Sequence, residues 1–349
     1  MYWLITRILM ILILILLYCL QGIYYVLLFS LLIFTILVIK LIRHDFTFNV
    51  EWNNTKETYY IYAPCLFLNR MCKDDDGIVI VDYGRHGKQY NPAYIGWYGL
   101  LNINEYYRTK KETNLDIAIL HAKWLKINFK DKEKFGYTWE YNFDRWENNT
   151  FLRKPWHSSM SQGLCISLLL RIGEILNDKE MLQIAERASY IFMFDINNGG
   201  LKHEENHGCI YEEYPAYPLT KVLDGNLFAL LGLYDLYKFT NKIQYHTLFL
   251  NGVRGIETII ENYNYRSKWS LYGIGYNILT TDMYNSLNCA LLNVVSCCSG
   301  SIILRKYANL WSGENLKMLD KVEIGLFRLC ALELLTFKTV SKAILRRIV

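Results

Sequence analysis

The chain has 349 residues, of which 52% are hydrophobic and 15% aromatic, and its formal net charge is +5. This composition is too apolar for a disordered protein, and no dense basic stripe with interleaved aromatic residues indicates a nucleic-acid partner. The 9 cysteines are an odd number without a CxxC spacing, which argues against a zinc cluster or a disulfide framework and favours buried free thiols.

Residues 1–43 are predicted to form a membrane anchor. Residues 2–39 are almost continuously apolar, and Arg7, Gln21 and Gly22 are the main interruptions. A membrane-spanning helix needs about 20 apolar residues, so the anchor is either one long helix or a hairpin that turns at Gln21 and Gly22. No small-residue cleavage site follows a short apolar core, which argues against a removed signal peptide. The expected location is therefore the membrane, and positive charges at both ends leave the sidedness open.

Residues 45–92 are predicted to form a small β-rich region, in which Phe46, Phe48 and Val50 alternate as in a strand. The run Asp74–Asp76 is typical of a turn. Its carboxylates could also bind Ca²⁺, but the EF-hand spacing is missing, so the turn is favoured. Neither a glycine-rich nucleotide-binding loop nor a zinc spacing is present. We therefore expect no cofactor, with Ca²⁺ as a minor alternative.

Beyond residue 92 the apolar residues recur with helical periodicity, so residues 93–349 are predicted to form a helical domain and the fold class is mainly α. The candidate helices cover residues 93–108, 112–128, 157–176, 179–194, 218–239, 242–264, 279–297 and 315–337. Two long aromatic connections, 131–156 and 196–217, separate them. Helix pairs joined alternately by short and long loops fit a toroid of α-hairpins whose long loops gather at one end.

Four segments carry a family resemblance, in the order Asn91–Leu100, Pro155–Gly163, Tyr211–Leu236 and Trp269–Tyr284. Together they resemble the D-glucuronyl C5-epimerases over about residues 90–297. The resemblance implies a β-rich N-terminal part, a C-terminal (α/α) toroid and a polysaccharide cleft between them. It also implies a reaction that inverts C5 of a D-glucuronosyl residue to give an L-iduronosyl residue, without redox chemistry.

The resemblance assigns catalytic roles by position to Glu213, Tyr214, Tyr272 and Tyr284. Inversion at C5 needs a base on one face of the sugar and an acid on the other. Tyrosine suits both roles, because a cationic or hydrogen-bonded setting can lower its pKa from about 10. We expect Tyr214 and Tyr284 to transfer the protons, with Tyr272 nearby. The expected substrate-binding residues are Tyr90, Trp156, His157, Gln162, Glu212 and Asn285.

The sequence departs from the family pattern near its last segment. Gly275 stands where the family has an arginine suited to a substrate carboxylate, Asn285 and Asn288 stand where it favours histidine, and Asp224 stands where it usually has asparagine. A site without that arginine needs another cation to stabilise the negative charge. The candidates are Arg85, His157 and Lys221.

The expected partner is a glycan that contains uronic acid, bound by a membrane-attached enzyme that forms a homodimer by analogy with the family. Three alternatives remain open. A uronate lyase would begin with the same proton abstraction at C5. A hydrolase would need a carboxylate pair made of Glu212 or Glu213 with Asp224 or Asp235. A glycan-binding or assembly protein without catalysis would explain the departures at Gly275 and Asn285.

Overall fold

The computed structural model describes residues 7, 9–14, 28–32, 48–50, 56–63, 71–276, 278–313 and 316–328. The chain divides into two compact units. One is Phe46–Glu314, and the other combines Met1–Asp45 with Asn315–Val349. The residues predicted to form a separate β-rich region thus belong to the same unit as the helices that follow.

The predicted membrane anchor, residues 1–43, lies mostly outside the described residues and stays a prediction. Its described parts, at 9–14 and 28–32, are helical. Among the described residues, one helix, Ser159–Leu176, is long and apolar enough to cross a membrane, but 78% of it is buried inside the protein. That helix belongs to the core of the larger unit.

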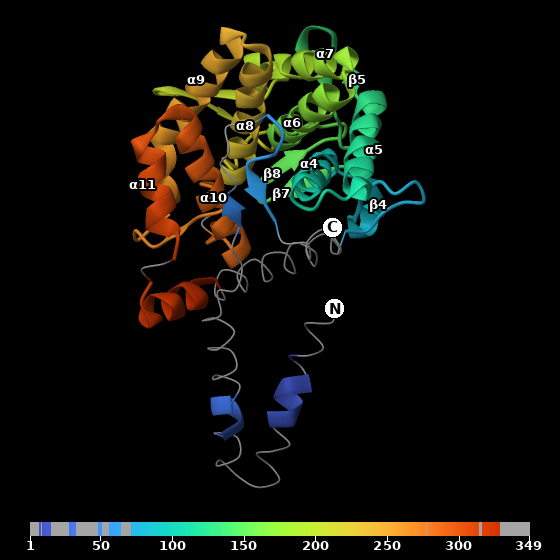
Figure 1. Cartoon of the computed structure of the whole chain (residues 1–349). Helices are drawn as coiled ribbons and strands as arrows, with labels where there is room; N and C mark the ends of the chain where they lie inside the picture. Colours follow the sequence, from blue (N-terminus) through green and yellow to red (C-terminus); the bar gives the residue numbers. More distant parts are fainter. Residues whose placement is uncertain are drawn as a thin grey trace, which may run out of the picture. The chain divides into compact units, whose positions relative to one another are not determined.

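The larger unit is mainly helical, as predicted, and its principal helices form four hairpins (Figure 1). They are α4 (Pro92–Thr109) with α5 (Glu112–Asn128), α6 (Ser159–Leu176) with α7 (Lys179–Ala188), α8 (Leu223–Thr240) with α9 (Ile243–Ile259), and α10 (Asp282–Ser299) with α11 (Ile302–Trp311). Helix α11 was not predicted, because its apolar pattern covers only ten residues between Gly300 and Ser312. The predicted helix 315–337 lies partly outside the described residues, and residues 318–328 are helical.

All four hairpins turn in the same way. Helices α4, α6, α8 and α10 end before a residue of left-handed backbone conformation, with φ of 57°, 52°, 56° and 77° at Lys110, Asn177, Asn241 and Gly300. One further residue then precedes the next helix. A left-handed residue ends a helix and turns the chain sharply, so each pair of helices lies antiparallel. The four hairpins therefore share one backbone geometry, although the sequence shows no repeat.

Helices α4, α6, α8 and α10 form an inner arc, and their partners lie outside it (Figure 1). Helix α6 packs between α4 and α8, and α8 also packs against α10. Glycines allow the close crossing of α6 and α8. A Cβ on Gly163 would lie 2.4 Å from the carbonyl oxygen of Phe228, and a Cβ on Gly232 would lie 2.5 Å from the Cα of Gly163.

The chain before the helices fills the gap between the two ends of this arc. Strand β1 (Asn49–Val50) contacts α10, and its antiparallel partner β2 (Ile61–Tyr62) contacts α4. The backbone N–H of Phe48 donates to Ser286 Oγ at 2.8 Å, and that of Tyr59 donates to Asn104 Oδ1 at 2.6 Å. The N-terminal segment thus closes the arc.

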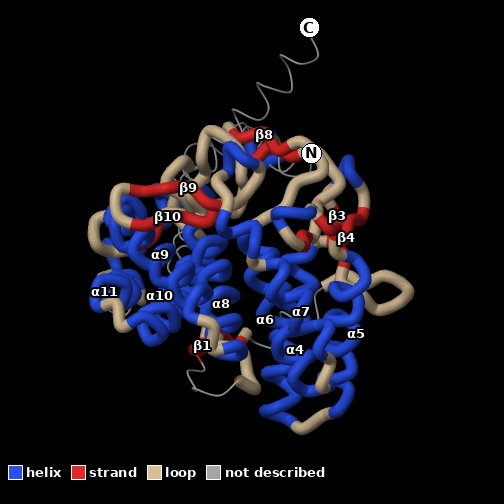
Figure 2. Tube along the Cα trace, turned by 90° about the horizontal axis from the view of Figure 1, so that it is seen from above, coloured by secondary structure: helices blue, strands red, loops and turns tan. Residues whose placement is uncertain are grey.

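The connections between hairpins carry short two-stranded antiparallel sheets. These are β3 (Ile80–Asp82) with β4 (Lys88–Tyr90), β5 (Lys130–Asp131) with β6 (Tyr137–Thr138), β7 (Arg145–Glu147) with β8 (Thr150–Leu152), β9 (Lys202–Glu205) with β10 (Gly208–Tyr211), and β11 (Asn264–Tyr265) with β12 (Trp269–Ser270). Figure 2 shows β3, β4, β8, β9 and β10 at one end of the helices and β1 at the other. Long connections therefore gather at one end, where the cavity described below lies.

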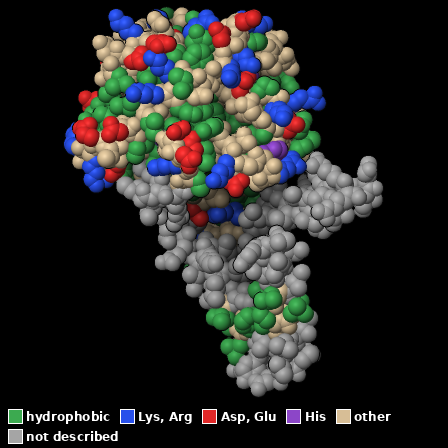
Figure 3. Space-filling model, turned by 90° about the vertical axis from the view of Figure 1, so that its right-hand side faces the viewer, with side chains coloured by type: hydrophobic (Ala, Val, Ile, Leu, Met, Phe, Trp, Pro, Cys, Tyr) green, Lys and Arg blue, Asp and Glu red, His purple; other side chains and the backbone are tan. Residues whose placement is uncertain are grey.

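Short 3-10 helices lie at Gly84–His86, Glu133–Phe135, Tyr190–Met193, Ile196–Asn198 and Ile260–Tyr263. On the face drawn in Figure 3, basic and acidic side chains are interspersed, so the excess positive charge is not concentrated there.

The expectation of buried free thiols is met only in part. The cysteines of the described residues are free, but Cys72 and Cys297 are exposed, whereas Cys165, Cys209 and Cys289 are buried. Cys19, Cys65 and Cys330 lie outside the described residues.

Candidate active site

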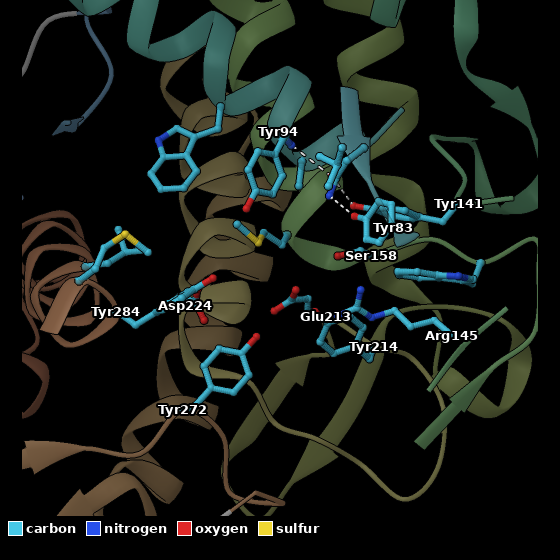
Figure 4. Close-up of a pocket in the computed structure, with 18 residues that line it drawn as sticks. Tyr83, Tyr94, Tyr141, Arg145, Ser158, Glu213, Tyr214, Asp224, Tyr272 and Tyr284 are labelled. Atoms are coloured by element: carbon cyan, nitrogen blue, oxygen red, sulfur yellow. Dashed lines mark hydrogen bonds between the residues drawn. The ribbon is translucent and has the colours of Figure 1, made fainter. Parts of the chain in front are cut away.

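A cavity of about 230 Å³ lies over the N-terminal ends of the four inner helices (Figure 4). Its lining comes from the first two turns of the inner helices α4, α6, α8 and α10, from strands β3 and β7, and from the loops next to the short strands. The lining residues are Val81, Tyr83, Asn91, Ala93, Tyr94, Trp97, Tyr141, Arg145, Trp156, Ser158, Met160, Glu213, Tyr214, Asp224, Tyr272, Met283, Tyr284 and Leu287. Four helix N-termini carry partial positive charge, which favours an anionic ligand.

Side-chain caps organise three of these helix ends. Asn91, Ser158 and Thr281 accept hydrogen bonds from backbone N–H groups in the first turns of α4, α6 and α10. Helix α8 starts without a side-chain cap at Val222 and has Asp224 in its first turn. Local capping thus fixes where each inner helix begins, and so which side chains reach the cavity.

Two buried carboxyl groups face the cavity. Glu213 follows β10 and Asp224 lies in the first turn of α8, and they are 7% and 3% exposed. Glu213 Oε2 and Asp224 Oδ1 have no hydrogen-bond partner in the described part of the chain. Burial, followed by the charge of Asp224, raises the pKa of Glu213 well above its usual value, and burial raises the pKa of Asp224 to about 7.

A glycine allows the two carboxyl-bearing elements to meet. A Cβ on Gly225 would lie 2.4 Å from Glu213 Oε2 and 2.7 Å from Glu213 Cβ. Any larger residue would therefore displace Glu213 from the end of α8. Because Gly225 directly follows Asp224, the same turn of helix positions one carboxyl and makes room for the other.

Tyrosines approach the two carboxyls from several sides. The hydroxyl ends of Tyr94 and Tyr272 point into the cavity from opposite sides, with Glu213 and Asp224 between them (Figure 4). The rings of Tyr272 and Tyr284 meet edge to face, with centroids 5.6 Å apart.

These phenols are protonated in the free protein. Burial, followed by the charge of Glu213, raises the pKa of Tyr214 and Tyr272 well above 10. Burial, followed by Asp224, raises the pKa of Tyr284. The sequence-based expectation of a lowered tyrosine pKa is therefore not met, since burial beside carboxyl groups outweighs the nearby cation.

Arg145 supplies that cation. It lies on β7, and its guanidinium carbon is 5.4 Å from the ring centroid of Tyr214 and 6.0 Å from that of Tyr83. Its Nε donates to Glu147 Oε2 at 2.8 Å. Burial opposes the charge, but Tyr214 and Glu147 raise the pKa of Arg145 above its ordinary value. Among the described residues that line the cavity, it is the only cation.

The cations proposed from the sequence lie elsewhere. Arg85 is exposed and donates to His86, and Lys221 pairs with Glu205 at 2.5 Å. His157 is half-buried, and desolvation of its ring lowers its pKa to about 4, so it is neutral. Sequence reasoning missed Arg145 because its loop, 131–156, carries no motif. The only signal was that the loop is long and aromatic.

The hairpin β7–β8 is attached to the opposite wall of the cavity. Tyr276 Oη donates to Glu147 Oε1 at 2.8 Å, and Asn148 Nδ2 donates to the carbonyl oxygen of Gly275 at 2.6 Å. Gly275, where the family pattern has arginine, therefore helps to hold the hairpin that carries Arg145.

An aromatic wall faces these charged groups. The rings of Tyr141 and Trp156 stack with centroids 4.0 Å apart. Trp156 Nε1 donates to the carbonyl oxygen of Phe143 at 2.9 Å, and Tyr141 Oη donates to Asn91 Oδ1 at 2.9 Å. These contacts fix both rings, which are buried, in the wall of the cavity.

The structure brings together six of the residues singled out from the sequence: Glu213, Tyr214, Asp224, Tyr272, Tyr284 and Trp156 all line the cavity. Tyr94 and Ser158, which lie in the segments that resemble the family but were given no role, line it too. Tyr83, Tyr141 and Arg145 come from outside those segments.

Five other residues expected to bind substrate lie outside the cavity lining, and hydrogen bonds within the protein hold most of them. Tyr90 is exposed and donates to Asp74 Oδ2 at 2.6 Å. Gln162 donates to the carbonyl oxygens of Tyr137 and Ala188. His157 is half-buried, and its ring interacts with the backbone of Gly199.

The remaining two are Glu212 and Asn285. Glu212 accepts from the backbone N–H of Lys221 at 2.9 Å and from Thr220 Oγ1 at 3.1 Å. Asn285 accepts from the backbone N–H of Ser270 at 3.0 Å and donates to the carbonyl oxygen of Trp311 at 2.7 Å. Both side chains position loops.

No group of three His, Cys, Asp or Glu side chains that could hold a metal ion occurs in the described ranges. At the Asp74–Asp76 turn, Asp74 Oδ1 accepts from the backbone N–H groups of Asp76 and Ile78. Its other oxygen accepts from Tyr90. This carboxylate thus stabilises the turn.

Comparison with known proteins relates the chain to carbohydrate-active enzymes. The family model described as D-glucuronyl C5-epimerase C-terminus matches residues 130–313. The chain is 27% identical over 282 residues to a D-glucuronyl C5-epimerase of Caenorhabditis elegans, covering 75% of this chain and 44% of that protein. It is 27% identical over 138 residues to an uncharacterized protein of Methanocaldococcus jannaschii, covering 38% of this chain and 44% of that protein. The chain thus spans less than half the length of these relatives.

Among solved structures, a family 76 α-mannanase of Bacteroides thetaiotaomicron aligns with a TM-score of 0.43 and 10% identity, over 63% of this chain and 56% of that chain. A family 76 glycoside hydrolase from a bovine strain of the same species aligns with a TM-score of 0.40 and 14% identity, over 64% and 45%.

Proposed function

The chain belongs to the D-glucuronyl C5-epimerase C-terminus family, and we propose that it is an epimerase that inverts C5 of D-glucuronosyl residues in a glycan. One observation carries the proposal. The cavity combines a cation, buried tyrosines and four helix N-termini, which are the groups that the chemistry of an anionic sugar needs. We take the arc of four hairpins, closed by the N-terminal segment, as a small (α/α) toroid with its cleft at the loop end.

The C5 hydrogen is weakly acidic because it lies next to the substrate carboxylate. When a base removes it, negative charge spreads into that carboxylate, and groups already aimed at this charge lower the barrier. Arg145 and the helix N-termini are placed for this role. In this proposal, Arg145 and the helix N-termini stabilise the charge on the substrate carboxylate, the role that the resemblance would give to an arginine at the position of Gly275.

Tyr214 lies on the side of Arg145, whereas Tyr272 and Tyr284 reach the cavity from the β12–α10 side. In the proposed reaction, a tyrosine on one side removes the C5 proton and breaks the C–H bond. A tyrosine on the other side gives its own proton to C5 and forms the new C–H bond. Both phenols then recover their protonation state by exchange with water. Both phenols are protonated in the free protein. The tyrosine that gives its proton to C5 is therefore ready, whereas the tyrosine that acts as the base must first lose its proton.

The test is isotope exchange in deuterated water. The full chain is incubated with glucuronate-containing glycans, and NMR follows deuterium at C5. Deuterium together with iduronate signals supports the epimerase. Deuterium with an unsaturated product identifies a lyase, and no exchange across a broad glycan panel favours a binding or assembly protein.

Single Tyr→Phe variants connect that test to the cavity. We expect Tyr272→Phe, Tyr284→Phe and Tyr214→Phe to lower the exchange rate by about 10²–10⁴-fold, the usual size of a general acid–base contribution. Tyr217→Phe is the matched control, since Tyr217 is 50% exposed and lies outside the cavity lining. Unchanged exchange in all three cavity variants would contradict the tyrosine mechanism.

A second candidate is glycoside hydrolysis, because the carboxyl groups of Glu213 and Asp224 line the same cavity. Paired carboxyls of this kind cleave glycosidic bonds in many enzymes. New reducing ends without deuterium at C5 would establish this activity. Asp235, the other aspartate considered for such a pair, is bound to Arg171 and lies away from the cavity.

Attachment to the membrane through residues 1–43 and a homodimeric assembly belong to the same proposal. The apolar composition of residues 2–39 supports the anchor. Sedimentation of the full chain with membranes, compared with a chain that begins at residue 45, tests it.

A further inference from the structure

Each of the carboxyl groups of Glu213 and Asp224 has one oxygen without a partner among the described residues, and these two oxygens suggest how the uronate is held. Both side chains are buried, both line the cavity, and each has an oxygen without a hydrogen-bond partner in the described part of the chain. A buried polar atom without a partner costs free energy. Two such oxygens facing the same small cavity therefore point to a ligand that pairs with them.

We propose that the pair Glu213 and Asp224 keeps one proton, carried by Glu213, and that Glu213 binds the carboxylate group of the sugar by donating an O–H hydrogen bond to it. This inference rests on the proposed function and names the group of the substrate that the pair contacts. Two carboxyls crowded into a buried site do not both ionise, because like charges repel strongly there. One of them then keeps a proton and can donate it to an anionic oxygen, as buried neutral carboxylic acids do in other active sites.

The surroundings favour a pair that keeps one proton. Arg145, the only cation among the described residues of the lining, donates to Glu147 and does not pair with either carboxyl. The phenols that face the pair stay protonated, because burial raises their pKa. They are Tyr83, Tyr94, Tyr214, Tyr272, Tyr276 and Tyr284. Near neutral pH the titration of this site is therefore that of the pair itself.

The test measures binding, so it does not depend on turnover. The ligands are methyl β-D-glucuronide and, as the neutral control, methyl β-D-glucoside. Calorimetry gives Kd for the full chain from pH 7 upward, because Asp224 loses its proton near pH 7 whereas burial and the charge of Asp224 raise the pKa of Glu213 well above its usual value. Once the pair has lost its proton, glucuronide binding is expected to weaken by up to about tenfold per pH unit, since one proton is bound together with the ligand. Glucoside binding should not change.

Variants assign the effect to the pair. Glu213→Gln replaces the titrating donor by an amide, so glucuronide binding should lose most of its pH dependence. Asp224→Asn removes the neighbouring charge, so Glu213 should ionise at lower pH and the weakening should begin there. A pH-independent Kd in the wild type, undetectable glucuronide binding below neutral pH, or an unchanged pH dependence in both variants would overturn the proposal.

Two further measurements keep this inference separate from the epimerase proposal. Glu212 is a second buried carboxyl whose pKa is raised to about 7, so both proteins carry Glu212→Gln in this measurement. Infrared spectra at neutral pH should then show a protonated carboxyl band that is lost when Glu213→Gln and Asp224→Asn are added. An equal band in both proteins would contradict the retained proton. Tyr272→Phe should keep the pH-dependent binding, even where C5 exchange is lost. Failure of exchange with intact binding would then count against the epimerase alone.

Discussion

Arg145 is the residue that most sets this cavity apart, because its guanidinium group contacts two tyrosine rings and one carboxylate at once. Lysine would keep the charge but lose the planar fork and the ring contacts. We expect Arg145→Lys to lower kcat/KM for a uronate glycan about tenfold and Arg145→Met to lower it further, since the charge that develops at C5 loses its counter-charge. Initial rates of C5 exchange measure both. Arg153→Met is the control, since Arg153 is exposed in the same loop. An unchanged kcat/KM in Arg145→Met would contradict the assignment.

Glu212 shows how a buried carboxyl near the cavity serves the fold. Burial raises its pKa from the usual 4.5 to about 7. Between these values the folded state holds a proton that the unfolded state has lost. The stability contribution of this group is therefore full below about pH 4.5 and is lost as the pH rises through about 7, a change on the order of 3 kcal/mol.

Glu212→Gln removes this titration. We expect the free energy of unfolding of the variant to rise relative to that of the wild type as the pH increases across this range. Urea unfolding at several pH values measures the difference. Glu204→Gln is the control, because Glu204 is exposed on the neighbouring strand. A difference between Glu212→Gln and the wild type that does not change with pH would contradict the raised pKa.

At the scale of elements, the crossing of α6 and α8 sets the shape of the inner arc. A Cβ on Gly163 would lie 2.4 Å from the carbonyl oxygen of Phe228 and 2.7 Å from the Cα of Ala229, and neither backbone atom can move without shifting α8. We expect Gly163→Ala to destabilise the protein by about 1–3 kcal/mol, as overpacking does. Denaturant unfolding measures the loss.

The control lies on the same helix. A Cβ on Gly173 would first meet the flexible end of Leu182, at 3.1 Å. Gly173→Ala should therefore cost less than Gly163→Ala, since the side chain can move aside. An equal loss in the free energy of unfolding of Gly163→Ala and Gly173→Ala would show that helix propensity, and not the close contact between α6 and α8, decides the effect.

At the scale of the whole molecule, one buried ion pair joins the N-terminal segment to two inner helices. Arg171 of α6 contacts Asp235 of α8 at 2.6 Å, and both side chains are fully buried. Tyr60 Oη donates to Asp235 Oδ1 at 2.5 Å, and Arg171 Nε donates to the carbonyl oxygen of Thr58 at 3.2 Å. These contacts therefore attach the N-terminal segment, which closes the arc, to helices α6 and α8.

Removing one partner leaves a buried charge without compensation. We expect Asp235→Asn to lower the free energy of unfolding by about 3–5 kcal/mol. In contrast, Lys242→Ala breaks a largely exposed pair with Glu186 and should cost less than about 1 kcal/mol. Thermal and urea unfolding compare the two variants. A loss below 1 kcal/mol in Asp235→Asn would mean that the N-terminal segment is held by apolar packing instead.

The sequence by itself determined the helices and the part of the site that lies in continuous segments. Periodicity and capping are local, so the helices α4, α5 and α6 begin and end within about two residues of their predicted bounds. Glu213 and Tyr214 follow one another in the chain and lie together in the cavity. Tyr272 and Tyr284 reach the same cavity from the segment that the family resemblance indicated.

Only the tertiary structure decided which other side chains share that cavity. Arg145 enters it because the β7–β8 hairpin is attached to Gly275 and Tyr276, more than a hundred residues later in the sequence. Gln162 and Asn285 lie within segments that resemble the family and yet are occupied by backbone hydrogen bonds. The physical reason is the same in each case: contacts between distant segments, and not local spacing, determine where a side chain points and whether its polar atoms are left for a ligand.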